Sequence, residues 1–146
     1  MDFIGKYLHH AVRIMLGALF FIMGLNGFFG FIPMEPMGGK AGAFLGALAE
    51  TGYFFPFLKV TEITAGGLLL AGFYVPLALL ILAPVALNIL MFHLFLAPAG
   101  LLMAVGIWMM ILYLAYIHRE SYKHLFVAKI HDEYHKKVAD NLVQNH

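Results

Sequence analysis

Four long stretches of the chain consist almost entirely of apolar residues, with short polar or turn-forming segments between them. A helix needs about 20 apolar residues to cross a hydrocarbon core of about 30 Å. The pattern therefore predicts four membrane-spanning helices, at about residues 11–31, 57–73, 76–96 and 101–117. Glycine and proline at 72–76 and 97–100 favour tight turns, so the last three helices should be antiparallel neighbours. We expect an all-α, integral membrane four-helix bundle in residues 1–118.

The connection between the first two predicted spans is long and has a helical pattern of its own. Its apolar residues recur at positions i, i+3, i+4 and i+7, namely Ala41, Phe44, Leu45 and Leu48. We predict a short helix with one apolar face here. It either lies at the level of the lipid head groups, which the neighbouring aromatic residues favour, or closes the mouth of the bundle as a lid.

Residues 119–146 have the pattern of an amphipathic helix. Apolar residues are spaced by four along one face, namely Tyr122, Phe126, Ile130, Tyr134 and Val138. His124, His131 and His135 lie on the opposite face, and the last two have the i, i+4 spacing that can bind a metal ion. Solvated histidines are the commoner origin of such a face, so we predict an amphipathic tail without a metal site.

Composition supports a membrane protein and narrows the chemistry. Of the 146 residues, 62% are hydrophobic and 12% are charged, compared with about 25% charged in soluble domains. The absence of cysteine excludes thiol redox chemistry, disulfides and thiolate metal sites. Basic residues flank the apolar runs instead of forming a nucleic-acid-binding stripe. They are also more frequent near the two termini than in the long connection, which predicts cytoplasmic termini and an outward-facing connection.

Four polar residues inside the predicted spans are the candidates for a ligand or proton-relay site: Glu62, His93, Asn26 and Asn88. A polar side chain in hydrocarbon is costly unless it has a partner, so such residues often mark a site. The predicted topology places Glu62, His93 and Asn26 at a similar depth in the outer leaflet. We expect Glu62 to meet His93 between helices, and Asn26 to bond Asn88.

A Glu62–His93 contact has two interpretations. It is either an interhelical hydrogen bond that holds the bundle together, or an acid–base pair able to polarise a ligand such as a quinone head group. No flavin or haem motif accompanies the pair. Two basic residues near the span ends, Arg13 and Lys59, are expected to extend toward the lipid phosphates. Lys59 could instead pair with Glu62, three residues later.

The residues of the first three spans resemble the DoxX-like family. The resemblance rests on short motifs in order: Arg13 to Gly17, Gly24 to Gly27, Glu62 to Gly72, Pro76 to Leu80, Ala83 to Asn88, and Phe92 to Phe95. It runs from about residue 11 to residue 118. It implies a multi-pass, four-helix protein of the bacterial inner membrane, in a family where some members accompany thiosulfate:quinone oxidoreductase or terminal oxidase systems.

These observations leave two functional hypotheses. In the first, the protein is an accessory or structural subunit of a larger membrane complex, respiratory or redox-linked, with lipid and other subunits or further copies of itself as partners. In the second, it is a quinone-interacting oxidoreductase component that uses Glu62 and His93. The chain has no self-sufficient catalytic set of its own, so the second hypothesis also needs a partner that carries another redox centre.

Overall fold

The computed structural model describes residues 3–123, with side chains described from Tyr7 onward. Its four long helices are α1 (Phe3–Phe29), α3 (Phe54–Ala71), α4 (Val75–Phe95) and α5 (Leu101–Ile117). Each provides a stretch long and apolar enough to cross a membrane, the last one together with the turn before it, as Pro98–Ile117. The predicted all-α four-helix bundle is confirmed, and the protein is a multi-pass membrane protein. Three of the four spans begin and end within about three residues of the prediction.

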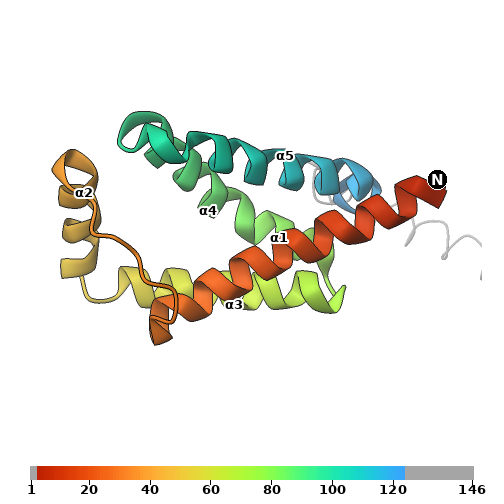
Figure 1. Cartoon of the computed structure of the whole chain (residues 1–146). Helices are drawn as coiled ribbons and strands as arrows, with labels where there is room; N and C mark the ends of the chain where they lie inside the picture. Colours follow the sequence, from red (N-terminus) through yellow and green to blue (C-terminus); the bar gives the residue numbers. More distant parts are fainter. Residues whose placement is uncertain (1–2, 124–146) are drawn as a thin grey trace, which may run out of the picture.

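Tight turns join the last three long helices, as predicted from the glycine and proline residues at 72–76 and 97–100. Gly72 ends α3 in the left-handed conformation, with φ 76°, and Pro76 lies in the first turn of α4. The 3-10 turn η1 (Pro98–Gly100) joins α4 to α5. Figure 1 shows the resulting alternation, in which α3, α4 and α5 run in opposing directions beside one another.

The closest helix pair is α1 with α3, which pack backbone against backbone. A Cβ atom added to Gly66 of α3 would lie 2.6 Å from the backbone nitrogen of Phe21 and 2.9 Å from the carbonyl oxygen of Gly17, both on α1. A side chain larger than hydrogen fits that gap only if the two helices move apart. Small residues commonly permit such approach between membrane helices, where packing replaces the hydrophobic effect as the driving force.

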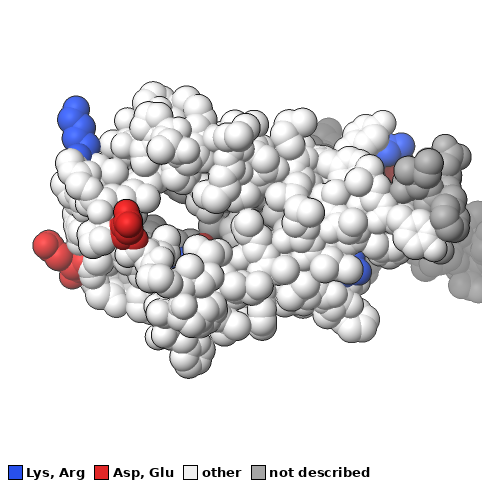
Figure 2. Space-filling model, in the orientation of Figure 1, with Lys and Arg blue, Asp and Glu red and all other residues white. Residues whose placement is uncertain are grey.

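The core between the four long helices is apolar. Its largest fully buried side chains are Phe20, Leu16, Leu69, Leu79, Leu82 and Leu114. The outside is apolar as well, since large side chains such as Phe29, Phe73 and Phe95 are more than two-thirds exposed. Figure 2 shows a mostly uncharged surface, with charged groups gathered mainly toward the two ends of the molecule. Such a surface is suited to contact with lipid.

The helix α2 (Gly39–Glu50) occupies the long connection, as predicted. It lies across one end of the bundle in Figure 1, and the ring of Phe44 approaches that of Phe92 on α4, with ring centroids 6.0 Å apart. Both predicted roles of this helix, at the level of the lipid head groups or as a lid over the bundle mouth, stay predictions.

The opposite end of the bundle carries the start of α1 and the short helix α6 (Arg119–Tyr122). The Tyr122 hydroxyl donates a hydrogen bond to the carbonyl oxygen of Pro76 on α4, at 3.1 Å. Burial raises the pKa of Tyr122 above its usual value of 10.0. The rest of the predicted tail, with His124, His131 and His135, lies outside the described residues.

Candidate functional site

Glu62 lies near the middle of α3 and pairs with Lys59 of the same helix. The Lys59 ammonium donates to the Glu62 carboxylate at 2.7 Å. The Glu62 side chain is 5% exposed and that of Lys59 is 20% exposed, so the ion pair is largely removed from the surface. Of the two interpretations of Lys59, pairing with Glu62 is confirmed. A carboxylate this deeply buried needs a compensating charge, and Lys59 supplies it from one helical turn away.

A glycine on the neighbouring helix makes room for the Lys59 side chain. A Cβ atom added to Gly27 of α1 would lie 2.5 Å from Cγ, 2.6 Å from Cδ and 2.9 Å from Cε of Lys59. The aliphatic stem of Lys59 therefore crosses α1 at the position where another residue would place its side chain. This packing directs the ammonium along the interface between α1 and α3 rather than out to the surface.

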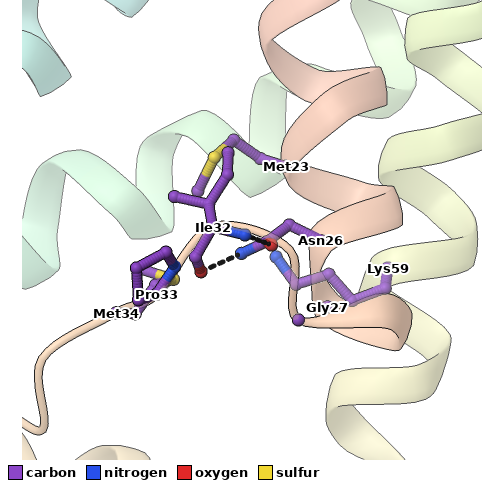
Figure 3. A pocket seen from close by; sticks show the side chains of 8 residues that line it. Met23, Asn26, Gly27, Ile32, Pro33, Met34 and Lys59 are labelled. Carbon is purple, nitrogen blue, oxygen red and sulfur yellow. Dashed lines mark hydrogen bonds between the residues drawn. The ribbon is translucent and has the colours of Figure 1, made fainter.

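Asn26, one residue before Gly27, holds the loop that follows α1. Its side-chain nitrogen donates to the carbonyl oxygen of Ile32 at 3.1 Å, and its side-chain oxygen accepts from the backbone nitrogen of Ile32 at 2.6 Å (Figure 3). Gly30 turns the chain between them with a φ of 59°. Asn26 is 6% exposed, so both bonds are shielded from solvent. The loop is thereby folded back against the end of α1.

The predicted bond between Asn26 and Asn88 is wrong. Asn88 lies exposed on α4, and its side-chain nitrogen donates to the carbonyl oxygen of Pro84 at 2.9 Å. Each asparagine therefore has backbone partners close to it in sequence. A carbonyl one turn earlier in the same helix is always within reach, whereas a partner on another helix needs a matching depth and direction.

The predicted contact between Glu62 and His93 is also wrong. His93 lies in the last turn of α4, and its Nδ1 donates to the carbonyl oxygen of Ala97 at 2.9 Å. Its ring lies directly over Gly100, where an added Cβ would overlap it. Within residues 3–123 no hydrogen bond or ion pair joins His93 to Glu62. Each group is satisfied within its own part of the chain, and His93 closes the turn between α4 and α5.

Arg13 of α1 has a partner that the sequence did not indicate. Its guanidinium donates to the backbone carbonyl oxygens of Leu69 and, at 3.2 Å, Leu70, near the end of α3. The last carbonyls of a helix lack intrahelical donors and carry partial negative charge, so a cation stabilises them. Arg13 thus ties α1 to α3 instead of extending toward lipid phosphate. One sequence feature could have indicated this contact. Because α1 and α3 are antiparallel, Arg13 in the first half of α1 lies beside the turn at Gly72 that ends α3.

A cavity of about 300 Å³ lies beside the ammonium of Lys59. Met23, Ile32, Pro33 and Met34 form its apolar wall, and Asn26, Gly27, Gly30 and Lys59 complete the lining (Figure 3). Figure 2 shows a hollow at this end of the molecule, with small patches of acidic and basic atoms at its floor. The cavity was not predicted from the sequence because part of its wall is a connecting loop that carries no recognisable motif. Asn26 holds this loop in place through its hydrogen bonds to Ile32.

Three histidines gather at the opposite end of the bundle. The ring centroid of His9 lies 5.2 Å from those of both His10 and His118. His118 ends α5 and is bonded through Nδ1 to the carbonyl oxygen of Leu114 at 2.9 Å. In the part of the chain that the structure describes, no three histidine, aspartate or glutamate side chains are arranged to hold a metal ion.

Comparison with family models, curated proteins and solved structures gives no match for this chain. The interpretation of the site therefore rests on its contacts. These contacts divide the candidate residues into two kinds. Asn26, Asn88 and His93 are engaged with backbone carbonyls or amides, whereas Lys59 and Glu62 form a buried ion pair at the edge of a cavity.

Proposed function

We propose that the protein is an accessory subunit of a larger membrane complex, respiratory or redox-linked, and that it is a DoxX-like protein of the bacterial inner membrane with both termini in the cytoplasm. The observation that carries the proposal is the engagement of its polar groups. Asn26, His93 and Arg13 each bind backbone atoms and thereby fix a loop, a turn or a helix end. Polar side chains that bind the backbone in this way stabilise the shape of the protein, which is what a structural subunit requires.

The outer surface supports the same proposal. Large aromatic side chains stand out from the ends of the helices, with Phe29, Phe57 and Phe95 each more than 70% exposed. Aromatic residues are enriched both at the membrane boundary and at protein interfaces. A rigid bundle with an apolar exterior is able to dock in the plane of the membrane against further subunits. The contacts of Glu62 and His93 give no support to an acid–base pair formed by these two residues.

Affinity purification from native membranes tests the proposal. The full-length protein, tagged at one end, is extracted in a mild detergent, and the eluate is analysed by quantitative mass spectrometry and native electrophoresis. We expect other membrane subunits in a fixed ratio to the tagged chain. An unrelated four-span protein expressed with the same tag controls for non-specific capture. Recovery of the chain without partners, alone or as a homo-oligomer, would contradict the assignment as an accessory subunit.

A further inference from the structure

The ammonium of Lys59 has hydrogen-bonding capacity that the fold does not use. A lysine ammonium has three N–H donors. Among the described residues, its one hydrogen-bond partner is the Glu62 carboxylate. The stem is fixed against Gly27, and the ammonium reaches the cavity beside the Asn26–Ile32 contact (Figure 3). A donor held in place beside a partly enclosed space favours an occupant that offers an oxygen acceptor.

The rest of the cavity is suited to an apolar body. Met23, Ile32 and Met34 face the space that Lys59 borders, and thioether and aliphatic side chains adapt to flat or irregular apolar groups. The cavity volume of about 300 Å³ is at the lower end of the range for small-molecule sites. Because Asn26 holds Ile32 through two hydrogen bonds, the wall is formed before any ligand arrives.

Charge decides what kind of acceptor fits. The positive charge of the Lys59 ammonium is balanced by the negative charge of the Glu62 carboxylate, 2.7 Å away. The pair therefore presents a dipole rather than a net charge. An anion in the cavity would meet the Lys59 ammonium but would also be repelled by the buried carboxylate behind it. A neutral carbonyl group accepts the N–H bond without that repulsion.

We propose that this cavity binds the carbonyl end of a neutral amphiphile, with Lys59 as the hydrogen-bond donor and Glu62 holding the donor in place. Two membrane components have this chemistry, namely a quinone through its ring carbonyl and a phospholipid through its ester carbonyl. Met34 at the rim is 66% exposed, so a hydrocarbon tail has a route out of the cavity toward lipid. The proposal concerns the isolated chain and does not depend on a partner subunit.

Native mass spectrometry of the purified full-length chain tests this proposal. The protein is released from delipidated detergent micelles after titration with each of four probes: decylubiquinone, dioleoyl phosphatidylcholine, its ether-linked analogue without ester carbonyls, and anionic dioleoyl phosphatidylglycerol. The test variant is Lys59→Met with Glu62→Gln, which removes both charges together. The matched control is Lys123→Met with Glu120→Gln, because this pair has the same spacing of three residues but is exposed on α6 and beyond its end.

We expect one molecule of decylubiquinone or of ester-linked phosphatidylcholine to bind the wild type and the control alike. The Lys59/Glu62 variant should bind it about tenfold more weakly or worse, since a charge-assisted hydrogen bond is lost. Binding of decylubiquinone identifies a quinone site, whereas binding of the ester lipid but not its ether analogue identifies a lipid ester. Equal binding by the Lys59/Glu62 variant, tighter binding of the anionic lipid, or no binding of any neutral probe would overturn the proposal.

A second variant keeps the test decisive if the Lys59/Glu62 variant does not fold. Met34→Trp adds bulk at the exposed rim and leaves the ion pair intact. It should abolish binding of the neutral probe, and unchanged binding would refute the proposal. If the chain binds the probe but co-purifies with no other subunits, only the accessory role is contradicted. If it co-purifies with other subunits but binds no neutral probe, only the cavity proposal is contradicted.

Discussion

The contact between α1 and α3 provides the sharpest test of the fold, because two adjacent glycines on α3 differ in what surrounds them. A Cβ added to Gly66 would lie 2.6 Å from the Phe21 backbone nitrogen. A Cβ added to Gly67 would lie 3.7 Å from the Phe21 ring, which is ordinary contact. We predict that Gly66→Ala destabilises the bundle and that Gly67→Ala does not.

The magnitude follows from two opposing effects. Replacing glycine by alanine inside a helix stabilises it by about 1 kcal/mol, and both variants gain this. Overpacking costs about 1–3 kcal/mol, and at Gly66 the obstructing atoms are backbone, so the helices must separate by roughly 1 Å to restore normal contact. The shared propensity gain cancels in the comparison. Gly66→Ala should therefore be less stable than Gly67→Ala by about 1–3 kcal/mol.

Reversible unfolding by sodium dodecyl sulfate in mixed micelles, followed by circular dichroism, measures this difference. The wild type and Gly106→Ala serve as references, since an added Cβ at Gly106 of α5 meets open space. Gly66→Ala should unfold at a lower detergent fraction than all three. If Gly66→Ala and Gly67→Ala unfolded together, the close backbone packing of α1 on α3 would be refuted.

Three further predictions concern the polar contacts. Lys59→Met should destabilise the protein by about 3–5 kcal/mol because Glu62 loses its compensating charge, and adding Glu62→Gln should restore part of that loss in the same unfolding assay. Asn26→Leu should release the loop at Ile32, which hydrogen exchange would detect as faster exchange of the Ile32 amide; unchanged protection would contradict the two-bond contact. Tyr122→Phe should cost about 1 kcal/mol at neutral pH. Because burial raises the pKa of folded Tyr122, wild-type stability should fall as the pH rises through and above 10.0, a loss that Tyr122→Phe should lack in unfolding measured against pH.

The sequence predicted the helices well because their determinants are local. Span length follows from the length of each apolar run, and the turns follow from residues such as Gly72 and Pro98, whose backbone preferences do not depend on distant contacts. The short helix of the long connection was predicted for the same reason, from the periodicity around Phe44. The beginning of α1 extends to Phe3, earlier than predicted, because its first turns carry polar residues that an apolar-run criterion leaves out.

The polar contacts were predicted less well because several partners compete for each group. The predicted topology placed Glu62 and His93 at a similar depth, but a local partner was available to each: Lys59 for Glu62 and the Ala97 carbonyl for His93. Arg13 shows the complementary error, since its partners are backbone carbonyls on another helix, which no side-chain motif marks and which only the alignment of Arg13 with the turn at Gly72 could indicate. Sequence spacing gives the set of possible partners, and packing between helices selects among them.

The two lysine–glutamate pairs of the described chain show how this selection works. Lys59–Glu62 and Glu120–Lys123 have the same spacing of three residues, yet the Glu62 side chain is 5% exposed while that of Glu120 is 65% exposed. The difference comes from the neighbouring helix, because Gly27 lets the stem of Lys59 lie inside the α1–α3 contact. An ion pair at the surface contributes little, whereas one held in an apolar interface is costly to break. Glycines therefore serve both features of the α1–α3 contact: Gly66 lets the two backbones approach, and Gly27 lets the Lys59 stem carry its ammonium to the cavity.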